Sequence, residues 1–182
     1  MTKNVWITGA SSGIGKALAI KFASEGWQVA ASARRENLLQ ELNKENPNIL
    51  SFPLDVTDGS LCKKVFNNIV EKFQIIDICV FCTGIHDPQS EKKISTEKIR
   101  EIMEVNFFGT LNCIMAVNNY FREKQSGHIS IVSSVAGYRG FPAASGWSSL
   151  CHKRYRFPRS DRIFLLIAAE LLRSPYLLRK QP

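Results

Sequence analysis

The run Thr8–Gly15, with the sequence TGASSGIG, constrains the fold of this chain more than any other feature. The segment 4–7 before it, apolar from position 5 onward, predicts a short buried strand, and apolar residues at positions 14, 17, 18 and 22 after it have the spacing of one helix face. Glycines in such a strand-to-helix turn let the backbone approach a pyrophosphate closely. The helix that follows offers free N–H groups and the positive end of its dipole. The run therefore predicts a nucleotide-binding turn.

Strand-like and helix-like segments alternate along most of the chain. Segment 76–81 is nearly all apolar, as expected of a strand whose two faces are covered by helices. This alternation predicts an α/β fold with a doubly wound parallel sheet. The predicted strands are 4–7, 28–32, 49–54, 76–81 and 128–133, and the predicted helices are 14–25, 36–45, 60–72, one or two within 95–124 with Gly109 at the joint, and a short one over 163–172.

Length and cysteine content narrow the class of protein. A chain of 182 residues fits one domain with a proper core. No signal segment is expected at the N-terminus, and the longest apolar run, 163–169, is too short to span a bilayer, so we expect no membrane partner. Five cysteines without framework spacing favour reduced thiols and a cytoplasmic location. Cys79 and Cys82 form a CxxC within a predicted strand, which we interpret as two structural cysteines rather than a redox pair.

The net charge of +8 raises the question of nucleic-acid binding. Residues 1–146 contain 16 Lys and Arg against 14 Asp and Glu, whereas residues 147–182 contain 8 against 2. The basicity therefore belongs to the C-terminal segment, and no nucleic-acid partner is expected. The same boundary divides the chain into a nucleotide-binding domain, 1–146, and an atypical basic tail, 147–182, that is not a separate domain.

The end of the second predicted strand indicates which dinucleotide the turn accepts. A site for NAD usually places an acidic residue there, on the ribose hydroxyl. This chain instead has Ala33 followed by Arg34 and Arg35. Arginine binds a 2′-phosphate through paired charge-assisted hydrogen bonds, which favours NADP over NAD. The alternative interpretation is that both arginines are simply solvated.

Four segments carry a family resemblance, namely Thr8–Gly15, Leu54–Asp58, Val105–Gly109 and Ile131–Gly137. In order and spacing they resemble the glycine turn, the LDVTD segment, the Asn-bearing helix motif and the Ser-bearing strand of the short-chain dehydrogenase/reductase family. The resemblance covers residues 1 to about 146. It implies a Rossmann-type sheet and an NADP(H)-dependent oxidoreductase that moves a hydride between nicotinamide and a small-molecule carbonyl or alcohol.

The resemblance also assigns roles to individual residues. It implies that Asn106 and Ser134 are what remains of the catalytic set, and it implies no metal site. Relatives often pair through the helices around the fifth strand, so a homo-oligomer is left open. The implied cofactor-binding residues are Gly9, Ser11, Ser12, Gly13, Ile14, Gly15, Arg34, Arg35, Asp55, Val56, Thr83 and Gly84.

Two departures from the family pattern bear on catalysis. The family's NNAG segment is replaced by Phe81–Gly84, which keeps only the glycine. The positions of the family's Tyr and Lys, four residues apart on one helix face, are occupied by Trp147 and Cys151. An indole N–H is no proton donor at neutral pH, and loss of the general acid costs about 10²- to 10⁴-fold in rate. Tyr155 lies too far along the chain to replace it, so we expect impaired catalysis.

The likeness to the family stops near residue 147. A frameshift is the most economical explanation, and a truncated pseudoenzyme is the competing one. Either predicts a sheet truncated after the fifth strand, with an exposed apolar edge along 128–133, marginal stability and aggregation. The alternative function is a non-catalytic nucleotide-binding or interaction module.

Overall fold

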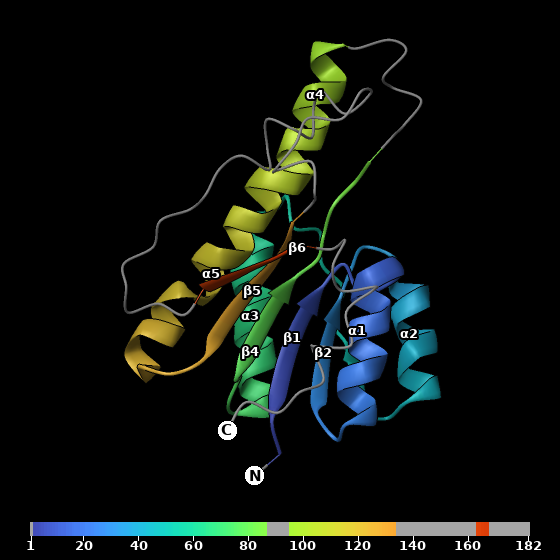
Figure 1. Ribbon diagram of the computed structural model, residues 1–182, viewed down its shortest axis with the longest axis vertical. Coiled ribbons are helices and arrows are strands. Elements are labelled where there is room, and N and C mark those ends of the chain that lie inside the picture. Colours follow the sequence, from blue (N-terminus) through green and yellow to red (C-terminus); the bar gives the residue numbers. More distant parts are fainter. Residues whose placement is uncertain (1, 87–94, 134–162, 168–182) are drawn as a thin grey trace.

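The protein is described here from a computed structural model, which places residues 2–86, 95–133 and 163–167. They form a six-stranded sheet in the order β3-β2-β1-β4-β5-β6, in which every neighbouring pair is parallel (Figure 1). Helices α1 and α2 cover one face of the sheet, and α3 and α5 cover the other (Figure 1). The elements are β1 (Asn4–Thr8), α1 (Gly13–Ser24), β2 (Gln28–Ser32), α2 (Glu36–Glu45), β3 (Ile49–Ser51), α3 (Gly59–Phe73), β4 (Ile78–Phe81), α4 (Thr96–Met103), the π-helical segment η2 (Glu104–Phe108), α5 (Gly109–Lys124), β5 (His128–Ser133) and β6 (Ile163–Ile167).

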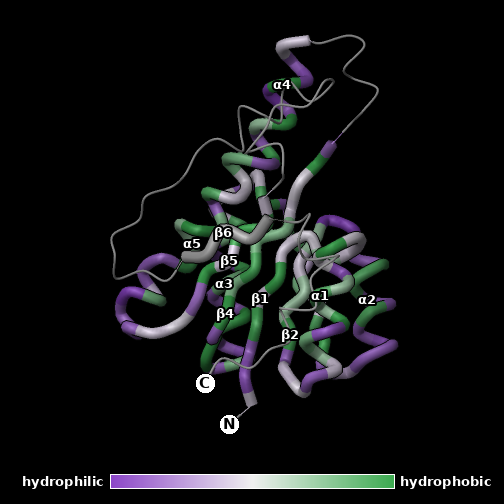
Figure 2. Tube along the Cα trace, viewed as in Figure 1, coloured by the Kyte–Doolittle hydropathy of each residue, from purple (hydrophilic) through white to green (hydrophobic). Residues whose placement is uncertain are grey.

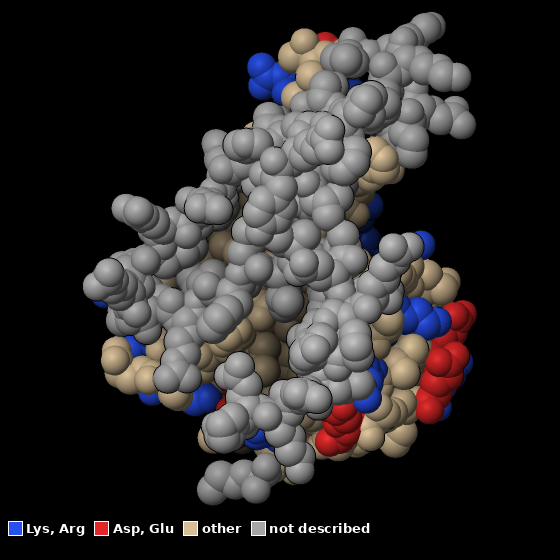
Figure 3. All heavy atoms as spheres, viewed as in Figure 1, with Lys and Arg blue, Asp and Glu red and all other residues tan. Residues whose placement is uncertain are grey.

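The alternation of side chains along the central strand β1 separates two hydrophobic cores. Val5 and Ile7 face α1 and α2, whereas Trp6 faces α3 and α5. Hydrophobic residues follow the strands, and hydrophilic residues gather on the outer sides of the helices (Figure 2). Over α1 and α2, charged side chains of both signs cover the face seen in Figure 3. Among the described residues, no helix combines the length and apolar character needed to cross a membrane.

Trp6 is the centre of the larger core and is fully buried. Its ring centroid lies 5.4 Å from that of Phe66 on α3 and 5.6 Å from that of Phe81 on β4. Its indole Nε1 donates a hydrogen bond of 2.9 Å to the Ser32 hydroxyl on β2, so the one polar atom of the side chain is satisfied. Trp6 therefore joins three strands and a helix through one side chain.

The C-terminal end of α5 is fastened to the start of β4. The Lys124 ammonium donates to the carbonyl of Ile76 at 2.9 Å, and the Tyr120 hydroxyl accepts from the amide of the same residue at 2.9 Å. The carboxylate of Asp77 lies 3.6 Å from the Lys124 ammonium and accepts from the Asn4 amide at 2.9 Å. These contacts fix the long helix against the N-terminal edge of the sheet.

The prediction of a doubly wound parallel sheet is confirmed, and α5 begins at Gly109, where a joint was expected. The predicted helix over 163–172 is wrong, because Ile163–Ile167 is a strand that pairs with β5 from Ile129 to Ser133. A short apolar run has no periodicity that separates a buried strand from a helix, and the free edge of β5 supplies the partner. The edge of β5 was expected to be exposed, and in the structure β6 pairs with it and covers it.

We predict that Trp6→Ala lowers the free energy of unfolding by about 3–5 kcal/mol, because it empties a fully packed aromatic site. Urea denaturation followed by circular dichroism measures this. The matched control is Ile20→Ala on α1, whose side chain is 41% exposed and which we expect to cost under about 1 kcal/mol. Equal losses in the two variants would contradict the assignment of Trp6 as the core anchor.

Candidate functional site

A cavity of about 370 Å³ opens at the carboxyl ends of the strands. It lies where the strand order reverses between β1 and β4, which is the usual ligand position in open α/β sheets. All twelve residues predicted to bind a cofactor line it. The lining residues are Gly9, Ser11, Ser12, Gly13, Ile14, Gly15, Ala33, Arg34, Arg35, Leu54, Asp55, Val56, Cys82, Thr83, Gly84, Ile85, Val105 and Val132.

The glycine turn packs directly against the end of β4. Gly9 has a φ of +70°, and a Cβ there would lie 2.9 Å from the carbonyl carbon of Cys82 and from the amide nitrogen of Thr83. A Cβ at Gly15 would lie 2.8 Å from the carbonyl carbon of Gly9. The glycine-rich segment and the start of α1 are thus in close contact, with no space for side chains between them. The backbone itself therefore forms the cavity wall here.

The N-terminus of α1 gives this wall a positive character. Ser12 is the N-cap and makes no side-chain capping hydrogen bond, and the first turn contains no acidic residue. The N–H groups of a first helical turn have no acceptor within the helix, and the helix dipole adds a partial positive charge. Since Ser12, Gly13 and Ile14 line the cavity, this end of α1 suits an anionic phosphate group.

A guanidinium group extends the positive wall toward the end of β2. Arg35 donates from Nη2 to the Ser11 hydroxyl at 2.9 Å and to the Ser12 hydroxyl at 2.7 Å. Its Nε also donates to Ser11, at 3.2 Å. Arg34 lines the same part of the cavity, and the segment after β2 has no carboxylate. Arg35 is solvent-exposed, as the alternative of solvated arginines expects, but its guanidinium is also hydrogen-bonded to two serines of the glycine turn.

Asp55 is the one acid among the described lining residues. Its Oδ1 accepts from the amide of Thr57 at 3.0 Å and from the Thr57 hydroxyl at 2.8 Å. This local turn shapes the loop after β3 and leaves the second carboxylate oxygen for other partners.

The far end of the cavity is formed by the chain after β4. The hydroxyl oxygen of Thr83 is buried and has no hydrogen-bond partner among the residues that the structure describes. A buried, unsatisfied hydroxyl in a cavity wall fits a ligand that supplies the missing partner. Thr83 is therefore an observation in favour of a polar ligand group at this end.

Asn106 lies in the π-helical segment η2 rather than in the cavity wall. Its side-chain oxygen accepts from the amide of Ile85 at 2.7 Å, and its side-chain nitrogen donates to the carbonyl of the same residue at 3.0 Å. Isolated π-helical turns occur frequently at functional sites. The arrangement fastens the chain after β4 to the helix that carries Asn106.

Ser134, Trp147 and Cys151 lie outside the described residues. Ser134 directly follows β5, which ends at Ser133. The predicted replacement of the family's Tyr and Lys therefore remains a prediction from the sequence.

The two cysteines of the CxxC lie within β4 and directly after it. Cys79 lies in β4 and is fully buried, and burial raises the pKa of its thiol well above the usual range. Cys82 follows β4, and burial raises the pKa of its thiol to about 12. Thiols with raised pKa values are poor nucleophiles, which agrees with a structural role for both.

Sequence reasoning missed several apolar lining residues: Leu54, Cys82, Ile85, Val105 and Val132. Three of them, Leu54, Cys82 and Val132, lie at or just after the carboxyl end of a predicted strand. That position was therefore the signal that could have found them.

Comparison with known proteins decides the family. The family model described as short chain dehydrogenase matches residues 3–149. The chain belongs to the short-chain dehydrogenase/reductase family. The mouse dehydrogenase/reductase SDR family member 7 is 32% identical over an alignment 156 residues long, which covers 81% of this chain and 46% of that protein. A 3-oxoacyl-[acyl-carrier-protein] reductase of Staphylococcus aureus is 27% identical over 81% of this chain and 62% of its own length.

Solved structures of the family have the same fold. The structure of ElxO with NADP bound matches with a TM-score of 0.77 and 30% identity over 84% of this chain and 63% of that one. The serine dehydrogenase of Escherichia coli matches with a TM-score of 0.75 and 27% identity over 82% of this chain and 70% of that one. The chain thus spans between about half and two thirds of the length of most of these short-chain dehydrogenase/reductase relatives.

We predict that Gly9→Ala destabilises the fold more than Gly26→Ala. Both glycines have a positive φ, of +70° and +83°, but a Cβ at Gly26 meets nothing within 4 Å. In both variants, backbone strain lowers the free energy of unfolding by about 1 kcal/mol. Only Gly9→Ala adds a steric clash with β4, which lowers it by about 1–3 kcal/mol more. Thermal unfolding measures the difference. Equal midpoints would show that the turn is not pressed against β4.

Proposed function

We propose that this chain binds NADP(H) in the cavity and derives from oxidoreductases that act on a small-molecule carbonyl or alcohol. The observation that carries the proposal is the pairing of Arg35 with Ser11 and Ser12 beside the N-terminus of α1. A cation beside the free N–H groups of α1 would face the phosphates of a bound dinucleotide, and this supports the proposal. The printed titles of two similar ElxO structures, which name NADP and NADPH, support this choice.

Each part of the cofactor has a matching group of residues. Gly9, Ser11, Ser12, Gly13, Ile14 and Gly15 would hold the pyrophosphate side. Arg34 and Arg35 would hold the 2′-phosphate. Asp55 and Val56 would flank the adenine. Thr83 and Gly84 would hold the nicotinamide ribose, and the Thr83 hydroxyl would gain its missing hydrogen-bond partner there. When bound, NADP(H) supplies or accepts the hydride.

The catalytic part of the proposal rests on four positions. Asn106 and Ser134 are the remaining members of the family's set, whereas Trp147 and Cys151 stand where the Tyr and Lys belong. The indole N–H of a tryptophan cannot supply the proton at neutral pH, and the thiol of a cysteine cannot supply the nearby cation. We therefore propose impaired hydride transfer, and a non-catalytic nucleotide-binding module is the second candidate function, favoured by this same pair of residues.

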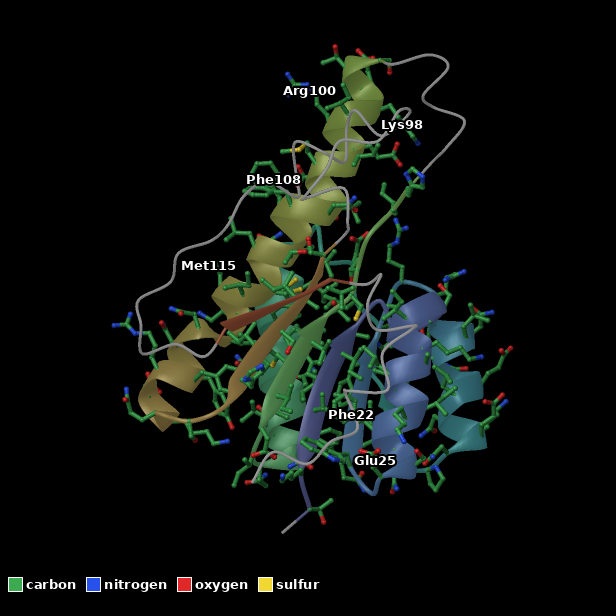
Figure 4. The ribbon with its side chains drawn as sticks, in the orientation of Figure 1. Phe22, Glu25, Lys98, Arg100, Phe108 and Met115 are labelled. Carbon is green, nitrogen blue, oxygen red and sulfur yellow. The ribbon has the colours of Figure 1, made fainter. Side chains whose placement is uncertain are left out.

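The surface of α5 supports a proposal about assembly. Phe108 is 44% exposed and Met115 is 66% exposed, and both project from the same outer side of the helical rod (Figure 4). Apolar side chains one behind the other on a helix are typical of a contact surface. We propose a homo-oligomer that uses this side.

Two further proposals concern the chain as a whole. Reduced cysteines favour a cytoplasmic location. We also propose that residues 1–146 form the nucleotide-binding domain and that residues 147–182 are an extension of it.

We predict that Arg35→Ala weakens NADPH binding by at least about tenfold and leaves NADH binding within about twofold, because only NADPH carries the 2′-phosphate that the guanidinium pairs with. Fluorescence titration of both cofactors measures this. Arg122→Ala, an exposed arginine near the end of α5, is the matched control and should change neither affinity. A parallel loss for the two cofactors would overturn the assignment of Arg35.

We predict that the chain binds NADPH but oxidises it with carbonyl substrates at a rate about 10²- to 10⁴-fold below that of an intact family enzyme, since the general acid is missing. The measurement is carbonyl-dependent loss of NADPH absorbance. Tyr155→Phe should leave the residual rate unchanged. Robust turnover that survives Tyr155→Phe would show an unsuspected proton donor and would contradict the proposed impairment.

A further inference from the structure

The loop after β3 carries the residues that flank the proposed adenine position, and it needs support from outside the sheet. The ladder between β2 and β3 ends at Ser51. Beyond it, the amides of Phe52 and Leu54 donate to carbonyls of Ala31 and Ala33 at 2.9 and 3.0 Å. Val56, two residues later, has no such backbone partner among the hydrogen bonds that hold this loop to β2.

Asn112 on α5 supplies that support. Its side-chain nitrogen donates to the carbonyl of Val56 at 3.0 Å and to the carbonyl of Thr57 at 3.3 Å. The side-chain oxygen of Asn112 faces the start of α3, where a Cβ on Gly59 would lie 3.2 Å from it. Asn112 itself is not a lining residue of the cavity, so it acts on the wall from behind.

Two further contacts hold Val56 at the same place. A Cβ on Gly109, one turn before Asn112, would lie 3.2 Å from the Cβ of Val56, so the helix backbone is in close contact with this side chain. The thiol of Cys62 on α3 donates to the Val56 carbonyl at 3.6 Å. The position of Val56 is thus set by α5 from one side and by α3 from the other.

The same helical rod holds the other end of the cavity. Asn106 in η2 is bonded to both backbone groups of Ile85 after β4, and Asn112, six residues later, is bonded to the loop after β3. The two asparagines hold opposite ends of the cavity from one continuous run of helix, which begins at the top of Figure 4 and continues into α5.

We infer that Asn112, together with the close contact between the Gly109 backbone and Val56, positions the loop for the adenine end of the cofactor, so that Asn112 is a positioning residue. It holds the Val56 and Thr57 carbonyls so that the wall keeps the shape that the adenosine half needs. This inference rests on the proposed function, because it presupposes that NADP(H) binds in the cavity. A positioning role of this kind predicts that replacing Asn112 lowers the affinity only through contacts with the adenosine half of the cofactor.

The test uses the full chain and two ligands. Adenosine 2′,5′-bisphosphate, which contains the adenosine half alone, is titrated by calorimetry, and NADPH is titrated by fluorescence. Asn112→Asp keeps the size of the side chain but removes the N–H donor and places a carboxylate against two carbonyl oxygens. Asn119→Ala, on an exposed position of the same helix, is the matched control.

We expect Asn112→Asp to weaken both ligands by about tenfold. At saturation the emission maximum of bound NADPH should equal that of the unmodified chain, because Asn106 still holds the nicotinamide end. Asn119→Ala should match the unmodified chain in every measurement. Unchanged affinity for adenosine 2′,5′-bisphosphate in Asn112→Asp would overturn the inference and leave the proposed function standing, whereas an unmodified chain that binds neither ligand would overturn both.

A second variant decides the case if Asn112→Asp does not fold. Gly109→Ala keeps both Asn112 hydrogen bonds and adds a methyl group that pushes on Val56 from the helix side. We expect the same loss of affinity, about tenfold, for adenosine 2′,5′-bisphosphate with an unshifted NADPH emission maximum. An affinity equal to that of the unmodified chain would show that the position of Val56 does not govern this end of the cavity.

Discussion

The close approach of the Gly9 backbone to the end of β4 is the constraint on which the rest of the site depends. With the atoms of Cys82 and Thr83 only 2.9 Å from where a Cβ would lie, β1 and β4 meet at their carboxyl ends with no side chain between them. The cavity opens at this point because the strand order reverses there. A larger residue in the turn would separate the two strands and remove the backbone wall of the cavity, where we propose that the phosphates bind.

Three kinds of interaction then shape the cavity around this contact. The Arg35 guanidinium, held by Ser11 and Ser12, makes the wall beside α1 positive. The Thr83 hydroxyl leaves a buried polar atom without a partner at the far end. Behind the wall, hydrogen bonds from η2 and α5 hold the loops after β4 and β3. The proposed cofactor site is therefore supported by a helical run that contributes only Val105 to its described lining.

The sequence predicted most of the fold and twelve of the residues that line the cavity, because both depend on local patterns such as the glycine turn and the alternating strands. It did not predict β6, since the run Ile163–Ile167 has no periodicity and becomes a strand only through pairing with β5. It also gave no sign of Asn112, which meets Val56 from a position 56 residues away along the chain. Contacts of that kind depend on how α5 packs on α3, and no short sequence motif predicts this packing.

The most direct test of the account is calorimetric titration of the purified chain with NADP⁺ and, in parallel, with NAD⁺. The account predicts one binding site per chain and an affinity for NADP⁺ at least about tenfold above that for NAD⁺, because the 2′-phosphate meets the arginine at the end of β2. Absence of binding heat with both dinucleotides would contradict the claim that this cavity is a dinucleotide site, and a preference for NAD⁺ would contradict the role given to Arg34 and Arg35.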